Sequence, residues 1–119
     1  MTDHIINAAE GSNPRTWPTP EHAYADAPTI LREIGWVART ARTLVDNPAD
    51  SEPARTYLLR KAALLDRIAL HDEQHHMPTD TSAVAEEAAL RLLDLDQPGV
   101  IRDPRHYVRR QYVYWARNN

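Results

Sequence analysis

The densest group of side chains that could carry chemistry is the run His71-Asp72-Glu73-Gln74-His75-His76. His71 and His75 are four residues apart, and on a helix this spacing lets two imidazoles reach one metal ion. A metal site needs a third ligand, for which the sequence offers only His22 and His106 by type. The alternative is that these histidines end a helix, where they interact with the negative end of its dipole and stay in water. We favour the second interpretation and keep metal binding as an alternative.

Asp66 is a single carboxylate within the most apolar segment of the chain. It lies between two apolar stripes of the predicted helix 53–75, so we expect it to be at least partly buried and to need a partner. Arg39 or Arg42 from the preceding helix could supply that partner. One buried acid without a second acid, a histidine or a metal is a poor general catalyst. We therefore predict that Asp66 fixes the register of two helices.

The last segment combines arginines with aromatic residues, in the run RDPRHYVRRQYVYWARNN. Arginines can neutralise phosphates while tyrosine and tryptophan stack on bases. On a helix, however, the aromatic residues and the arginines separate onto opposite faces, and residues 72–96 carry seven acids against Arg91. Core packing with internal charge pairing is therefore the preferred interpretation, and a nucleic-acid interface is an alternative. Its contact residues would be Arg105, Arg109, Arg110 and Arg117.

Trp36 lies off the apolar face of its predicted helix, between Arg32 and Arg39. An exposed tryptophan between arginines is typical of a protein interface. The alternative is that the N-terminal segment, with Trp17, folds over it. The predicted partner-binding residues are Arg32, Trp36, Arg39, Tyr112 and Trp115.

Prolines and acidic caps divide the chain into four amphipathic stretches, at about 28–46, 53–75, 81–96 and 104–117. In the first, apolar residues at three- and four-residue spacing form one face: Ile30, Ile34, Val37, Ala38, Ala41, Leu44 and Val45. The third is expected to bury Val84, Ala85, Ala88, Leu92 and Leu95. The valines and tyrosines of the last stretch would also suit a strand.

The stretch 53–75 is apolar on most sides, with a polar strip formed mainly by Arg60, Arg67, His71 and Gln74. Such a helix belongs at the centre of its fold. The expected fold is all-α: a small antiparallel bundle of about four helices in one domain, residues 19–119, preceded by a flexible arm, residues 1–18.

The amino-acid composition excludes some classes of function and disfavours others. The chain has 119 residues, a net charge of −3 and no cysteine, which excludes disulfides and thiol chemistry and disfavours coating of nucleic acid by bulk charge. Three glycines could hardly build a phosphate loop, and no cofactor is expected. We find no signal peptide or membrane-spanning run, so the cytoplasm is the expected location. Lys61 is the only lysine beside 13 arginines, which indicates a GC-rich genome.

The run from Tyr57 to Leu70, the segment from Ala27 to Trp36 and the aromatic C-terminus resemble small helical proteins of actinomycetes with no established activity. That resemblance implies a compact helical domain and transfers no site residue. We expect a non-enzymatic interaction or regulatory accessory protein that self-associates or docks on a protein partner. A small DNA-associated regulator and a metal-binding protein are the alternatives.

Overall fold

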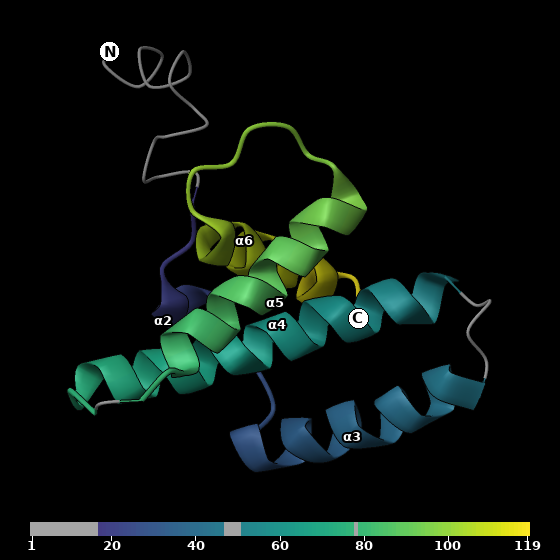
Figure 1. The fold of residues 1–119 in the computed structure, drawn as a ribbon, viewed down its shortest axis with the longest axis horizontal. Coiled ribbons are helices and arrows are strands. Elements are labelled where there is room, and N and C mark those ends of the chain that lie inside the picture. Colours follow the sequence, from purple (N-terminus) through teal and green to yellow (C-terminus); the bar gives the residue numbers. More distant parts are fainter. Residues whose placement is uncertain (1–16, 47–50, 78) are drawn as a thin grey trace.

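The computed structural model describes residues 17–46, 51–77 and 79–119, which form helices and short connections (Figure 1). The helices are α2 (Pro20–Ala23), α3 (Ile30–Asp46), α4 (Ser51–Gln74), α5 (Thr81–Asp96) and α6 (Pro104–Arg117). No strand occurs in these ranges, so the all-α class is confirmed and the last segment is a helix. The four long helices match the predicted stretches, and α2 is an additional short one.

The helices begin where prolines and capping side chains favour a start. The Thr19 hydroxyl accepts a hydrogen bond from the backbone N–H of His22, at 3.1 Å, just before the first proline of α2. At α6, the Asp103 carboxylate accepts from the backbone N–H of Arg105 at 3.0 Å. These caps satisfy donors that the first helical turn leaves free, and the following prolines fit there because they lack an N–H.

Helix α4 is the central element, as its apolar character predicts. It packs against α3, α5 and α6, and in Figure 1 α3 and α5 lie on opposite sides of it. Helix α6 packs against both α4 and α5, and α5 passes in front of it in this view. The core is formed by Leu59, Ala62 and Ala63 of α4, Ala89 and Leu92 of α5, and Tyr107, Val108 and Tyr112 of α6.

The expected buried face of α5 is partly wrong. Ala85, Ala89 and Leu92 are buried, whereas Val84 and Leu95 are 41% and 51% exposed. Helix α5 fits into the angle between α4 and α6, and small residues allow it to approach both. That orientation turns Val84 and Leu95 away from the core.

The expected packing of α3 is also partly wrong, because only Ile30, Val37, Ala41 and Leu44 of its expected apolar face are half-buried. Its one fully buried residue is Glu33, while Leu31, Ile34 and Val45 are 79%, 44% and 78% exposed. Glu33 binds Arg60, which belongs to the polar strip of α4. Helix α3 therefore docks through a polar contact, and that contact rotates much of its apolar face into solvent.

Residues 1–16 of the predicted arm lie outside the described residues. Trp17 is packed against the core cluster, with the Arg110 guanidinium 4.0 Å from its ring centroid. Its ring also lies beside that of His106 on α6. Trp17 thus sits on the α6 side and does not cover Trp36.

Because Leu92 has no exposed surface, Leu92→Ala should lower the free energy of unfolding by about 2–5 kcal/mol through lost burial and the cavity left behind. The matched change Leu31→Ala, at an exposed leucine, should stay within about 0.5 kcal/mol. Urea denaturation measures both. A large loss at Leu31 would show that α3 buries its apolar face.

Candidate functional site

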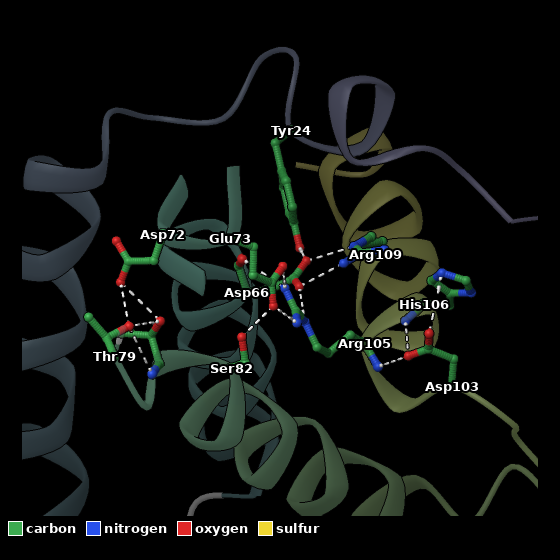
Figure 2. A network of polar contacts seen from close by, with 11 residues as sticks. Tyr24, Asp66, Asp72, Glu73, Thr79, Ser82, Asp103, Arg105, His106 and Arg109 are labelled. Atoms are coloured by element: carbon green, nitrogen blue, oxygen red, sulfur yellow. Dashed lines mark hydrogen bonds and ion pairs between the residues drawn. The ribbon is translucent and has the colours of Figure 1, made fainter. Parts of the chain in front are cut away.

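A buried carboxylate joins three helices (Figure 2). Asp66 has no exposed surface and lies about two-thirds of the way along α4. The Arg109 guanidinium donates to both of its oxygens, Nε to Oδ2 at 2.8 Å and Nη2 to Oδ1 at 2.9 Å. Arg105 Nε donates to Oδ1 at 2.6 Å, and the Tyr24 hydroxyl donates to Oδ2 at 2.6 Å. Both carboxylate oxygens are therefore saturated by donors.

The donors reach Asp66 because of their positions in the helices. Arg105 and Arg109 are four residues apart on α6 and so share one face of that helix. Tyr24 is the residue at which α2 ends, and its hydroxyl spans the gap to α4. Arg39 and Arg42, which we expected as partners of Asp66, are exposed on α3. The sequence positions of Arg39, Arg42 and Asp66 gave no indication that α6 also packs beside Asp66.

Arg105 continues the network to the end of α4. Its Nη1 donates to Glu73 at 2.7 Å, and the Ser82 hydroxyl of α5 donates to the same carboxylate. The hydrogen bond from Arg105 lowers the pKa of Glu73, and that from Ser82 adds to the effect. Asp72 accepts from Thr79 and Thr81, at 3.1 and 3.0 Å, across the turn into α5. The network thus ties the α4–α5 turn to α6.

The electrostatics of this cluster suit a structural role. Burial raises the pKa of the Tyr24 hydroxyl, and the neighbouring Asp66 raises it further. Burial acts to lower the pKa of Arg105, but hydrogen bonds to Glu73 and Asp66 outweigh it and raise that pKa. A carboxylate that has no exposed surface and accepts from two guanidinium groups cannot exchange protons with a substrate. Asp66 is thus buried and paired, as the sequence predicts, and its architectural role stays a prediction.

A second polar cluster joins the start of α4 to α5 and α6. Arg55 donates to both Asp96 oxygens, at 2.8 and 2.6 Å, and the Tyr107 hydroxyl donates to Oδ2 at 2.7 Å. The hydrogen bond from Arg55 lowers the pKa of Asp96. Burial, together with the hydrogen bond to Asp96, raises the pKa of Tyr107 to about 12. No aspect of the sequence pattern pointed to this cluster.

Trp36 is covered by its own chain. The Arg60 guanidinium lies 3.6 Å from the centroid of the Trp36 ring and 5.0 Å from that of Trp115 on α6. Arg60 also donates to both oxygens of Glu33, at 2.8 and 2.6 Å. Of the other predicted partner-binding residues, Tyr112 is 3% exposed in the core, Trp115 is half-buried, and Arg32 and Arg39 are exposed. Tyr112 is therefore withdrawn from the surface, whereas the other four residues stay at least partly accessible.

The predicted nucleic-acid contacts divide in the same way. Arg105 and Arg109 bind Asp66, and Arg109 is only 7% exposed. Arg110 lies over the Trp17 ring, whereas Arg117 is exposed. The aromatic and basic residues of α6 thus serve mainly internal packing, which is the preferred interpretation of the sequence.

The His71 and His75 rings are stacked, with centroids 4.3 Å apart and an interplanar angle of 29°. Imidazole lone pairs lie in the ring plane, so stacked rings present nearly parallel lone pairs that do not converge on one ion. His75 Nδ1 is also within 2.7 Å of the His71 carbonyl oxygen. Among the described residues, no three His, Asp or Glu side chains are grouped so that they could hold a metal.

The clearest unpartnered feature is an apolar surface that we call the open face. On α3 it follows Leu31, Ile34, Ala38, Ala41 and Val45, which lie on the side opposite Trp36. On α5 it includes Val84 and Leu95, which are 41% and 51% exposed. Between them, Leu58, Lys61 and Leu65 of α4 line a groove with Val84, Glu87, Ala88 and Arg91 of α5. Leu58 and Ala88 also pack against the core.

The open face is turned away from α6. Trp36 marks the α6 side of α3, because Arg60 contacts both Trp36 and Trp115. On α4, Lys61 lies opposite the core residue Leu59. The groove between α4 and α5 has a volume of about 100 Å³. It is too small for a typical ligand, whose pockets span about 300–1,000 Å³, but it can take single side chains of a protein.

A larger depression of about 510 Å³ lies between α2 and the end of α6. Its polar side chains include His22, Asp26 and Arg117. These groups carry both signs of charge, and none is a nucleophile placed beside a base, so they define no reaction class.

Family models, curated proteins and solved structures were compared with this chain, and none of them matches it. None of the described helices has both the length and the apolar character needed to cross a membrane.

Removing Asp66 should be costly, because Arg109 would keep its charge inside the protein without a counter-charge. We expect Asp66→Ala to lower the free energy of unfolding by about 3–5 kcal/mol. The double variant Asp66→Leu/Arg109→Met should recover most of that loss, since it removes both charges. Urea denaturation compares them, with Asp26→Ala, at an exposed aspartate, as the control. Equal stability of Asp66→Ala and Asp26→Ala would contradict the architectural role.

The Asp96 cluster should make stability depend on acid. Since the pKa of Asp96 is lowered in the folded state, its contribution is present above the unfolded carboxyl pKa of about 3.9 and disappears as pH falls through the lower folded value. Asp96→Asn should therefore lose less stability than the wild type between pH 5 and pH 2, whereas Asp26→Asn should behave like the wild type. Chemical denaturation across this pH range tests the expectation, and parallel profiles for all three chains would refute it.

Proposed function

We propose that this chain is a non-enzymatic interaction protein and that the open face is its binding surface. The observation that carries the proposal is the exposure of Leu31, Ile34 and Val45 on one stripe of α3. Single exposed apolar residues are common, but several on one stripe of a helix are typical of a protein–protein contact. This replaces Trp36 and Trp115, which the chain itself covers, as the centre of the interface.

The spacing of the α3 stripe supports binding to a helix. Leu31, Ile34, Ala38, Ala41 and Val45 follow one another at intervals of three, four, three and four residues. This is the a/d pattern by which two helices pack side by side, and a seam of this kind remains exposed until a second helix covers it. Alanines at two of the five positions allow close approach of a partner backbone.

The polar clusters support the same proposal because each is engaged within the fold. Asp66 and Asp96 are saturated by arginine and tyrosine donors, so neither offers a general acid or base. A DNA-associated regulator would need its α6 arginines to contact phosphates. Two of the four proposed contacts, Arg105 and Arg109, are bound to Asp66 instead. The metal alternative rests on two imidazoles whose rings are stacked.

Site-specific photo-crosslinking tests the proposal. A photoreactive phenylalanine analogue at position 31 should form a protein adduct in the native cell extract, because the open face is covered when it is bound. The same analogue at Tyr114, which is 48% exposed on α6, serves as the matched control and should yield far less adduct.

Adding Ile34→Asp should remove the adduct at position 31, because a carboxylate in an apolar contact is costly to bury. Since Ile34 is 44% exposed, the variant should keep the helicity and thermal midpoint of the wild type. An equal yield at positions 31 and 114, or an adduct that survives Ile34→Asp, would overturn the proposal.

A further inference from the structure

We infer that the depression between α2 and the end of α6 binds a small zwitterion with an apolar body, the class to which the free apolar amino acids belong. The depression shares no residue with the open face, so this site is separate from the proposed protein contact. The inference is carried by the apolar lining of the depression and by two charged side chains on its two sides.

The depression has the size and lining of a small-molecule site. Its volume is about 510 Å³, within the range of about 300–1,000 Å³ that such sites span. Tyr112 is only 3% exposed, and its ring centroid lies 5.4 Å from that of the half-buried Trp115. The Arg60 guanidinium, which does not line the depression, lies 5.0 Å from the Trp115 centroid, so two neighbours hold this ring in place. The other apolar lining residues are Ala23, Ala27, Pro28, Val113 and Ala116.

The two sides of the depression carry opposite charges. Asp26 belongs to the connection between α2 and α3, whereas Arg117 is the last residue of α6. Both side chains are exposed, and neither forms an ion pair with any residue that the structure describes. They line the same depression but do not pair with each other. A ligand between them can therefore present an ammonium group to Asp26 and a carboxylate to Arg117.

The remaining polar groups of the depression do not replace these two contacts. The Asn119 side-chain amide donates to the Trp115 carbonyl at 2.7 Å, and so occupies a group at the end of α6 that would otherwise attract a cation. His22 lies on the same side as Asp26, and an imidazole carries little charge at pH 7.5. Asp26 and Arg117 are therefore the charged contacts that a ligand meets.

A ligand with a single charge suits this depression less well. An amine pairs with Asp26 but adds a second cation near Arg117, and a carboxylate pairs with Arg117 but adds an anion near Asp26. A zwitterion avoids both repulsions. Its apolar body can cover the exposed part of Trp115, which removes apolar surface of both molecules from water. The two charges and the apolar lining together select an apolar amino acid.

Titration of the full chain with related ligands tests the inference, with amide chemical shifts as the measurement. At pH 7.5, L-phenylalanine and L-leucine should give saturable shifts in residues 22–28 and 112–119. Glycine has both charges but no apolar body, and should bind about ten-fold more weakly or worse than phenylalanine. Phenylethylamine and 3-phenylpropionate each lack one charge, and should bind about three- to ten-fold more weakly than phenylalanine, as expected for charge pairs that remain partly exposed.

Two charge variants assign each ligand group to its partner. Arg117→Gln should remove the difference between phenylalanine and phenylethylamine but keep the difference from phenylpropionate, and Asp26→Asn should do the reverse. Both side chains are exposed, so the variants should keep the thermal midpoint of the wild type. The matched controls Arg102→Gln and Asp94→Asn, at exposed residues outside the depression, should retain both differences.

The inference is overturned if neither phenylalanine nor leucine gives saturable shifts at these residues. It is also overturned if phenylethylamine or phenylpropionate binds the wild type as tightly as phenylalanine does. An unchanged ranking of the ligands in Arg117→Gln and Asp26→Asn would overturn it as well, because recognition would then not involve these two side chains. None of these results bears on the open face, which the crosslink at position 31 tests separately.

Discussion

One buried carboxylate sets the geometry of this protein. Asp66 has no exposed surface, and Arg105 and Arg109 of α6 both donate hydrogen bonds to it. That pairing fixes the rotation of α6 and its position along α4, because a shift of one residue would withdraw both guanidinium groups. The Tyr24 hydroxyl, at the end of α2, also donates a hydrogen bond to Asp66 and so attaches α2 to this cluster. Breaking such a buried pair is strongly unfavourable, so the arrangement is specific even though the apolar core is small and contains several alanines.

Once α6 and α5 cover one side of α4, the remaining contact on α4 is polar. Arg60 takes Glu33 and Trp36, and this contact orients α3. The pairing of Glu33 with Arg60 therefore leaves apolar side chains of α3 exposed. These side chains form the α3 part of the open face. Uncovered apolar surface on a small domain is destabilising unless association covers it, which connects the interior electrostatics to the proposed interface.

Much of the fold could be predicted from the sequence because its signals are local. Prolines and capping residues such as Thr19 and Asp103 mark helix starts, and the apolar circumference of 53–75 marks the central helix. The faces of α3 and α5 could not be predicted in the same way. Amphipathicity states which residues are apolar but not which side a neighbour will cover. The partners of Asp66 were missed for the same reason, since an arginine 39 or 43 residues away in the chain has no local signature.

The attachment of α3 has a consequence for the motions of the native state. Helix α3 packs mainly on α4, and its one fully buried side chain there is Glu33, paired with Arg60, whereas α4, α5 and α6 share the core. Elements with few buried apolar contacts open locally without global unfolding. The amide hydrogens of α3 would then exchange with solvent as a separate cooperative unit, ahead of those in the other long helices. A protein that binds the open face would hold α3 against α4, so association and the local folding of α3 are thermodynamically linked.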